Sequence, residues 1–382
     1  MTRNRCRIVT VVGARPNFMK AAPIQRELTK RSDCFAPRLV HTGQHYDPGL
    51  SQVFFDELEI APPDATLAVG SRSHAQQTAA IMVGFEKVLQ DWSTDLVVVV
   101  GDVNSTLACA LVAAKMGLPV AHVEAGLRSF DRSMPEEINR VLTDHLADYL
   151  FATEASALEN LRREGIPDER VHLVGNVMID TLFSHRERAR GLAAPARHGV
   201  RKGEYALLTL HRPSNVDDPK GFERLMAGIS AIAEDVPVLF PVHPRTRPSV
   251  TRSARATALV SAARLRLLEP LGYHEFIGLM DDSAAVLTDS GGAQEESTAL
   301  GVPCLTLREN TERPITVTSG TNRIVGSDPE RIVAAWRDIQ RNGRTSSRPP
   351  LWDGGAAGRI VDVFAAAHNG TRKPALSCNS RL

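Results

Sequence analysis

Three carboxylates, Asp102, Glu124 and Glu136, lie where the sequence indicates that strands end and helices begin. Asp102 follows the apolar run Leu96–Val100, and Glu124 follows Val120–Val123. Because successive strand–helix units end at one edge of a parallel sheet, we expect the three acids to converge in one cleft. Carboxylates that share a cleft push their pKa values apart, which suits proton transfer. No DxD or His–carboxylate spacing typical of a tightly bound metal accompanies them, so we predict acid–base chemistry with no metal and no cofactor.

Each of these acids also has a purely structural explanation. Asp, Asn and Ser are good helix caps, and the loop around Asp102 taken alone favours an N-cap. Glu124 could simply form an ion pair with Arg128. Glu136 lies at the fourth position of Ser133-Met134-Pro135-Glu136, which is a capping-box pattern. The functional interpretation therefore depends on the three acids together.

A histidine supplies an acid–base candidate in the second half of the chain. His211 directly follows the apolar run 206–210. Histidine is the side chain that most readily carries a proton near neutral pH. The alternative is a histidine that only caps the end of a strand. His243, in Val242-His243-Pro244-Arg245, is a weaker candidate of the same kind.

The most specific local motif is Thr288-Asp289-Ser290-Gly291-Gly292-Ala293-Gln294-Glu295-Glu296. An apolar run leads into Ser290, Gly291 and Gly292, and a helix pattern begins at once. Adjacent glycines at a helix N-terminus expose backbone N–H groups, which predicts a cradle for a diphosphate. Glu296 could reach a ribose hydroxyl pair, and Arg313 could bind the phosphates. The alternative is a glycine-rich turn without a ligand.

The first strand–helix loop, Gly13 to Lys20, is a second candidate for anion binding. Its glycine permits close approach of a ligand, and Arg15 and Lys20 could bind a phosphate. A tight turn with surface cations explains it equally well. The spacing is neither GxGxxG nor a P-loop, which disfavours nicotinamide cofactors and simple ATP cleavage.

The elements that must position these residues alternate between short apolar runs and helical patterns along most of the chain. This alternation predicts an α/β protein with parallel sheets. With 382 residues the chain is long enough for two domains. We place them at residues 1–183, with the acids, and 204–353, with the diphosphate cradle. The polar segment 184–203 is the expected linker. Residues 354–382 are expected to form a last helix and a frayed tail.

The composition excludes several classes of protein. A net charge of +1 lacks the basic excess of a nucleic-acid binder. The apolar runs are far shorter than the roughly 20 residues of a membrane span, so we expect no membrane association. The five cysteines are scattered without a CxxC spacing, which is typical of free thiols and favours a cytoplasmic location.

Several of these segments, in this order, resemble the non-hydrolysing UDP-N-acetylglucosamine 2-epimerases. The resemblance extends from about residue 8 to residue 363, over GARPNFMK, GDVNSTLA, HVEAGLRSFDRSMPEEINR, LHRPSNVD, LTDSGGAQEES and TERP. It implies two Rossmann-like domains in the glycosyltransferase-B architecture, with the active site in the cleft between them. It also implies a homodimer and a C-terminal helix that packs back on the first domain.

The resemblance further implies a reaction. The family eliminates UDP in the anti sense to give 2-acetamidoglucal and adds it back after C2 is protonated on the other face. The implied roles are proton handling, assistance to the leaving diphosphate, binding of UDP, and packing against uracil. The residues in these roles are, in turn, Asp102, Glu124 and Glu136; His211; Ser290, Gly291, Gly292, Glu296 and Arg313; and Leu271 and Phe276. Arg15 and Lys20 are implied to line the same cleft and to contribute to substrate binding.

The chain also departs from the well-known bacterial members, with Asn17 and Ser214 where glutamates are usual. These features resemble relatives that epimerise UDP-2,3-diacetamido-2,3-dideoxy-glucuronic acid, which leaves the sugar open. A hydrolysing 2-epimerase, a glycosyltransferase of the same fold and a non-catalytic nucleotide-sugar sensor are further alternatives. The product would serve polysaccharide or secondary-metabolite biosynthesis.

Overall fold

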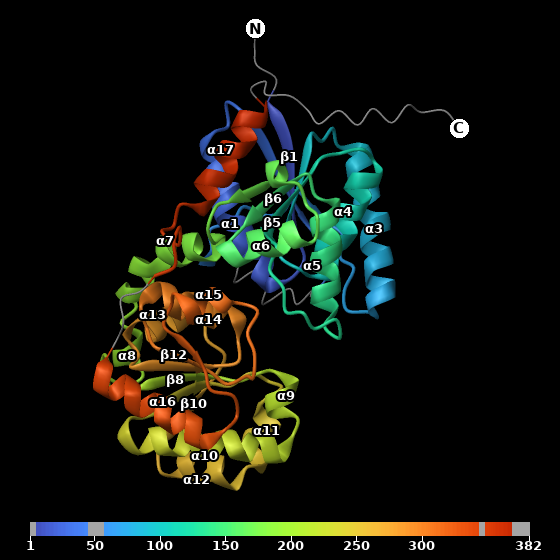
Figure 1. Cartoon of the computed structure of the whole chain (residues 1–382). Helices are drawn as coiled ribbons and strands as arrows, with labels where there is room; N and C mark the ends of the chain where they lie inside the picture. The colour runs from blue at the N-terminus through green and yellow to red at the C-terminus, as the bar shows by residue number, and fades with distance from the viewer. Residues whose placement is uncertain (1–4, 45–56, 344–347, 369–382) are drawn as a thin grey trace.

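The structure is a computed structural model that describes residues 5–44, 57–343 and 348–368. Within these ranges the chain forms two α/β lobes, each built on one parallel sheet (Figure 1). The frayed tail expected at the C-terminus lies outside the described residues.

The N-terminal lobe contains, within the described ranges, a seven-stranded parallel sheet of order β3-β2-β1-β4-β5-β6-β7. Its strands are β1 (Cys6–Val12), β2 (Phe35–His41), β3 (Ala65–Thr66), β4 (Leu96–Val100), β5 (Val120–Ala125), β6 (Tyr149–Ala152) and β7 (Val171–Leu173). The connecting helices are α1 (Arg15–Lys30), α3 (His74–Asp91), α4 (Asn104–Lys115), α5 (Pro135–Leu146), α6 (Ala155–Arg163) and α7 (Val177–Gly191).

The C-terminal lobe has, in the part of the chain described, a six-stranded parallel sheet of order β10-β9-β8-β11-β12-β13. Its strands are β8 (Ala206–Thr209), β9 (Val238–Pro241), β10 (Leu265–Leu268), β11 (Ala285–Thr288), β12 (Cys304–Thr306) and β13 (Asn322–Ile324). Its helices are α9 (Pro213–Val216), α10 (Pro219–Asp235), α11 (Arg247–Arg252), α12 (Ala254–Ser261), α13 (Tyr273–Asp282), α14 (Gly291–Leu300), α15 (Pro314–Thr318) and α16 (Pro329–Asn342).

The central strands of each sheet are buried because helices cover both faces, whereas residues of the edge strands β3, β7 and β10 are partly exposed. Every residue of β4 is buried, and its Val-rich sequence suits a strand that contacts apolar side chains on both faces. In β5, the polar residues His122 and Glu124 are buried with the rest of the strand. Buried polar groups need partners, so both side chains must be paired with groups close to the end of β5.

Helix α7 changes the expected linker at residues 184–203. The helix continues through Ser184 to Gly191, and a short α8 (Ala194–Arg197) follows before β8. His185 and Ala189 are buried, because this half of α7 packs against α13 of the other lobe. The segment that looked polar and irregular in sequence is therefore mostly a helix at the junction of the two lobes.

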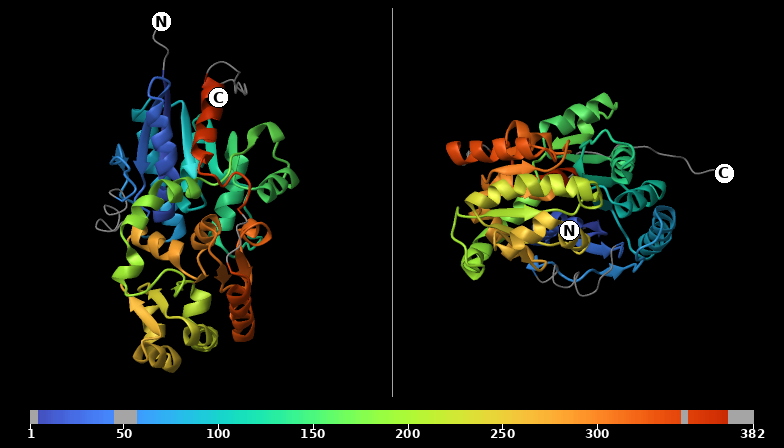
Figure 2. Two further views of the ribbon diagram at one scale, coloured as in Figure 1. Left: turned by 90° about the vertical axis from the view of Figure 1, so that its left-hand side faces the viewer. Right: turned by 90° about the horizontal axis from the view of Figure 1, so that it is seen from below.

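The last described helix, α17 (Ala356–His368), packs on the N-terminal lobe (Figures 1 and 2). Ile360 and Phe364 join the apolar core formed with β1, β2 and β4. Asp180 of α7 caps the helix, since its two carboxylate oxygens accept the N–H groups of Ala356 and Ala357 at 3.1 and 2.6 Å. No helix among the described residues is long and apolar enough to cross a membrane.

Candidate active site

A cavity of about 490 Å³ lies between the two lobes, at the carboxyl ends of their strands. Loops that follow β4 and β5 line one side, and loops that follow β8, β9, β10 and β11 line the other. Twelve of the predicted site residues contact this cavity: Lys20, Asp102, Glu124, Glu136, His211, Leu271, Phe276, Ser290, Gly291, Gly292, Glu296 and Arg313. The thirteenth, Arg15, is the first residue of α1, and its side chain lies outside what the structure describes.

Glu124 is held between two cations, one from each lobe. Its Oε2 lies 2.6 Å from Nζ of Lys20, and its Oε1 accepts a 2.8 Å hydrogen bond from Nη2 of Arg313. Burial would raise the pKa of Glu124, but Lys20 and Arg313 hold it below the usual value for Glu. Glu124 is therefore an anion at neutral pH, and its pair with Arg313 joins the lobes across the cavity.

The local pairing of Glu124 with Arg128 does not occur. Arg128 is directed away from the cavity, where its Nη2 donates to Asp144 at 2.7 Å and its Nε donates to Glu164 at 2.7 Å. Glu124 itself has a left-handed backbone, with φ of 73°, one residue before the end of β5.

Asp102 forms an ion pair with Arg140 of α5 and does not act as a helix cap. The N-cap of α4 is Val103, which has no side chain that could accept a hydrogen bond. Asn139 supports the loop by donating a 2.9 Å hydrogen bond to the Asp102 carbonyl. Burial would raise the pKa of Asp102, but Arg140 and Lys20 lower it below the usual value for Asp.

Glu136 lies in the first turn of α5 and lines the cavity. The capping-box interpretation is wrong, because the N-cap is Met134 and Ser133 instead donates to Asp131 through both its amide and its hydroxyl. Pro135 occupies the first position of α5, so the helix begins one residue later than the capping-box pattern predicted.

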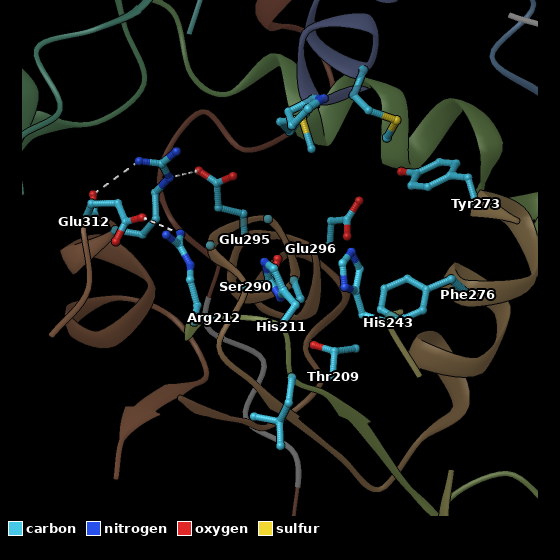
Figure 3. A pocket seen from close by; sticks show the side chains of 18 of the residues that line it. Thr209, His211, Arg212, His243, Tyr273, Phe276, Ser290, Glu295, Glu296 and Glu312 are labelled. Carbon is cyan, nitrogen blue, oxygen red and sulfur yellow. Dashed lines mark hydrogen bonds and ion pairs between the residues drawn. The ribbon is translucent and has the colours of Figure 1, made fainter. Parts of the chain in front are cut away.

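His211 is oriented by Asp289, which the sequence analysis did not select. The ring Nδ1 lies 2.9 Å from Oδ1 of Asp289. Oδ2 of the same carboxylate accepts hydrogen bonds from the amide of Arg212 at 2.9 Å and from Nδ2 of Asn215 at 3.1 Å. Burial would raise the pKa of Asp289, but His211 and Arg212 keep it lower than usual. Figure 3 shows His211 directed into the cavity, near Ser290.

The glycines that begin α14 leave open space at the N-terminus of this helix. A Cβ at Gly291 would meet only Oε1 of Glu312 at 3.6 Å, and one at Gly292 would meet nothing closer than 4.0 Å. Neither glycine has a positive φ. Neither packing nor backbone conformation therefore requires glycine at these two positions, and the backbone N–H groups are open to the cavity.

A second group of residues lines the part of the cavity that lies next to α13 and α14. Leu271, Tyr273 and Phe276 come from the loop before α13 and from α13 itself. Glu296 is buried in the second turn of α14. Burial and the nearby Glu296 carboxylate raise the pKa of the Tyr273 phenol, which stays protonated at neutral pH. Figure 3 shows Tyr273 and Phe276 opposite Arg212 and Glu312.

Glu295 is another cavity residue that the sequence analysis missed, although it lies within the quoted motif. It pairs with Nε of Arg313 at 2.6 Å and accepts a 3.0 Å hydrogen bond from Asn176 of the other lobe. Burial raises its pKa to about 7, against the opposing effect of Arg313. Arg313 thus contacts carboxylates from both lobes.

Some of the missed residues had a signal in the sequence. Asp289 directly follows an apolar strand, as Asp102 nearly does, and that signal could have identified it. Arg140 and Glu295 had no such signal, because their roles depend on contacts with other elements. Among the described residues, no group of His, Cys, Asp or Glu side chains could hold a metal ion.

The fold and the position of the cavity define the class of protein. Two parallel-sheet α/β lobes with a cavity between the carboxyl ends of their strands form the glycosyltransferase-B-like architecture. A crystal structure of UDP-GlcNAc 2-epimerase from Methanocaldococcus jannaschii, in complex with UDP-GlcNAc and UDP, superposes on this chain with a TM-score of 0.84. It is 41% identical, and the match covers 94% of this chain and 100% of that one.

Sequence comparison gives the family. The profile of the family described as UDP-N-acetylglucosamine 2-epimerase matches residues 26–365. A UDP-N-acetylglucosamine 2-epimerase of Methanococcus maripaludis is 40% identical over 96% of this chain and 100% of its own length. A UDP-2,3-diacetamido-2,3-dideoxy-D-glucuronate 2-epimerase of Pseudomonas aeruginosa is 39% identical over 94% of this chain and 99% of its own. The chain belongs to the UDP-N-acetylglucosamine 2-epimerase family, and this membership supports an epimerase activity.

Proposed function

We propose that this protein interconverts UDP-N-acetylglucosamine and UDP-N-acetylmannosamine by reversible epimerisation at C2, without net hydrolysis. One observation carries the proposal: carboxylates of the N-terminal lobe face a histidine and an open helix N-terminus of the C-terminal lobe across a single cavity. Such a cavity would hold the sugar against the acids and the diphosphate against the cations and N–H groups.

The proposed first step is anti elimination. A carboxylate takes the proton from C2, the electron pair of that bond forms the C1=C2 double bond, and the C1–O bond breaks with its electrons moving to UDP. The product is 2-acetamidoglucal together with bound UDP. In the reverse direction UDP adds again at C1 while C2 receives a proton on the opposite face, which inverts its configuration.

The three acids of this site have different environments, which suggests how proton transfer is divided among them. Glu124 is anionic between Lys20 and Arg313, and Asp102 is anionic beside Arg140. Glu136 has a more open position at the start of α5, where it can exchange a proton with the sugar or with solvent. We propose that all three handle the C2 proton, since epimerisation needs groups on both faces of the sugar.

The leaving diphosphate needs stabilisation as it takes up negative charge. The N–H groups at Ser290, Gly291 and Gly292, which line the cavity, and the dipole of α14 would stabilise a diphosphate bound there. His211, oriented by Asp289, would donate from Nε2, and Arg313 would reach the phosphates from the same side. Lys20 and Arg15 are proposed to assist from the other lobe.

The uridine would occupy the part of the cavity beyond α14. Phe276 and Leu271 offer an apolar surface for uracil, and the Glu296 carboxylate could accept hydrogen bonds from the ribose hydroxyls. The cavity volume of about 490 Å³ lies within the range of ordinary small-molecule sites.

The sugar is a separate question, and the relatives supply two candidates. One is named for UDP-N-acetylglucosamine, and another for UDP-2,3-diacetamido-2,3-dideoxy-D-glucuronate. The similar identities of 40% and 39% make the second sugar the alternative that needs direct comparison. Assays with both nucleotide sugars, each supplied alone, decide between them.

Incubation with UDP-N-acetylglucosamine in D2O tests the proposal. Deuterium at C2 of the recovered sugars, together with the manno epimer, is expected. Absence of both would refute the proposal for this sugar. Free UDP that accumulates with N-acetylmannosamine would indicate a hydrolysing epimerase, and turnover only with an acceptor would indicate a glycosyltransferase. A non-catalytic sensor would bind UDP equally well before and after Asp102→Asn and show no activity in either form.

The oligomeric state and cellular setting are also proposals. We propose a homodimer in the cytoplasm that supplies a nucleotide sugar for polysaccharide or secondary-metabolite biosynthesis. Light scattering of the purified protein tests the dimer, and a mass equal to one chain would refute it.

A further inference from the structure

A cluster of four titratable or charged groups, three of them buried and Glu164 partly exposed, lies behind the carboxylates, and no step of the proposed reaction uses it. The cluster consists of His122 on β5, Arg128 in the following loop, Asp144 on α5 and Glu164 at the end of α6. The side chains of His122 and Asp144 are fully buried, and that of Arg128 is nearly so. Charges are buried in proteins when they are paired, so the ionic state of this cluster is constrained.

Both ring nitrogens of His122 face hydrogen-bond acceptors. Nε2 lies 2.8 Å from the carbonyl oxygen of Gly101, and Nδ1 lies 2.6 Å from Oδ1 of Asp144. A carbonyl oxygen only accepts, so Nε2 must carry a proton. A neutral ring would then place an unprotonated Nδ1 against a carboxylate oxygen.

The surroundings of Asp144 decide where the second proton lies. Its Oδ2 accepts hydrogen bonds from the Gly126 amide at 3.1 Å and from Arg128 at 2.7 Å. Burial would raise the pKa of Asp144, but His122 and Arg128 hold it below its usual range. With Asp144 ionised, His122 carries both ring protons, and the two cations balance Asp144 and Glu164.

The cluster holds the backbone on each side of the proposed acids. Gly101 directly precedes Asp102, and Gly126 follows Glu124 by two residues. Glu124 has a φ of 73°, and the pairing of β5 with β6 shifts register at this residue. A non-glycine residue with a left-handed backbone is strained, and this conformation persists only where its surroundings enforce it. The hydrogen bonds to Gly101 and Gly126 are placed to enforce it.

We propose that His122, doubly protonated and held by Asp144, is a positioning residue that fixes Asp102 and Glu124 relative to each other. The inference rests on the proposed function, because it assigns a purpose to the exact placement of two acids that handle the C2 proton. Its role differs from that of a catalytic residue, since His122 acts on the acids through the carbonyl of Gly101 and, by way of Asp144, through the amide of Gly126.

The variant His122→Gln tests this role, because the one nitrogen of a glutamine amide replaces only one of the two ring nitrogens, so one acceptor loses its donor. A matched control is His172→Gln, which changes a histidine of β7 that packs beside Phe151 and Tyr149 in the same lobe. Turnover is expressed per UDP-binding site measured by titration calorimetry, so that loss of folded protein does not count. Substrate with deuterium at C2 reports whether proton removal limits the rate.

We expect His122→Gln to lower kcat per UDP-binding site by roughly 10²-fold, the effect of misplacing a reacting group by about 1 Å. The deuterium isotope effect on kcat should rise, while KM and the affinity for UDP change little. His172→Gln should match the wild type. A His122→Gln enzyme with wild-type kcat and isotope effect per site would overturn the inference.

The failure of this inference can be told from failure of the proposed function. A wild-type protein that incorporates no deuterium at C2 overturns both, whereas incorporation by wild type and variant at equal rates overturns only the role of His122. If His122→Gln does not fold, ¹⁵N-histidine NMR of the wild type decides. A ring with two exchange-protected N–H protons at pH 8 is expected, and the absence of any such ring would overturn the inference.

Discussion

The contact between His211 and Asp289 gives a prediction that can be worked out from the structure. In Asp289→Asn the amide has one oxygen in place of two. Oδ2 of Asp289 accepts hydrogen bonds from the amides of His211 and Arg212 and from Asn215, at 3.0, 2.9 and 3.1 Å. The asparagine oxygen should keep this position, which turns the NH2 group toward Nδ1 of His211.

The expected decrease in kcat follows from the changed hydrogen bond to the His211 ring. Nδ1 of His211 must then accept a hydrogen bond from the amide, so the ring no longer faces a carboxylate and its hydrogen bond to residue 289 becomes one to an uncharged group. Hydrogen bonds from a charged group contribute about 1.5–3 kcal/mol, and neutral ones about 0.5–1.5 kcal/mol. A difference of about 1.4 kcal/mol in the stabilisation of the leaving diphosphate corresponds to a roughly tenfold lower kcat.

The assay is kcat for epimerisation, per UDP-binding site, with thermal unfolding measured in parallel. A suitable control is Asp217→Asn, since Asp217 forms an exposed pair with Arg245 in the same lobe and lies away from the cavity lining. The control should keep wild-type kcat. An Asp289→Asn enzyme with unchanged kcat would refute the proposed role of His211 in assisting UDP departure.

Three further predictions concern binding and stability. Gly292→Ala should weaken UDP binding at least about tenfold without changing Tm, because the added Cβ would project into the open space where the ligand is proposed to bind. The control Gly358→Ala should leave UDP binding unchanged. Asp180→Ala should lower the free energy of unfolding by about 1–2 kcal/mol and speed amide hydrogen exchange in α17, because the cap of this helix is lost. The control is Asp362→Asn, at an exposed position of the same helix, which should change neither quantity. Equal exchange rates in the two variants would contradict the capping role of Asp180. Burial lowers the pKa of His185 to about 4, so the unfolded state binds a proton more readily than the folded state between pH 6.5 and 4. Over this range the free energy of unfolding of the wild type should fall by about 3 kcal/mol relative to that of His185→Gln, as measured by urea unfolding. Parallel curves of stability against pH for the two proteins would contradict this prediction.

Much of the architecture could be predicted because the responsible signals are local. Short Val-rich runs such as Leu96–Val100 alternate with helical patterns, and this order predicts parallel strands with covering helices. Twelve of the thirteen predicted site residues border one cavity because loops after parallel strands meet at one edge. Their individual roles remain predictions.

The wrong interpretations were also local. The capping patterns at Asp102 and Ser133 fit short-range rules, but Val103 and Met134 are the N-caps in the structure. Arg128 was the nearest cation to Glu124 in sequence, yet it pairs with Asp144 and Glu164. Ion pairs form between groups that meet in space, so proximity along the chain was a poor guide.

The sequence by itself determined the α/β alternation, the acids at the ends of strands β4 and β5, and the glycines that begin α14. Only the tertiary structure decided which charges meet: Arg313 comes from the other lobe to Glu124, and Arg140 comes from α5 to Asp102. The same holds for Glu295 and Asp289, whose partners are far away in the chain. The physical reason is that buried charges require partners, and the fold alone decides which residues can supply them.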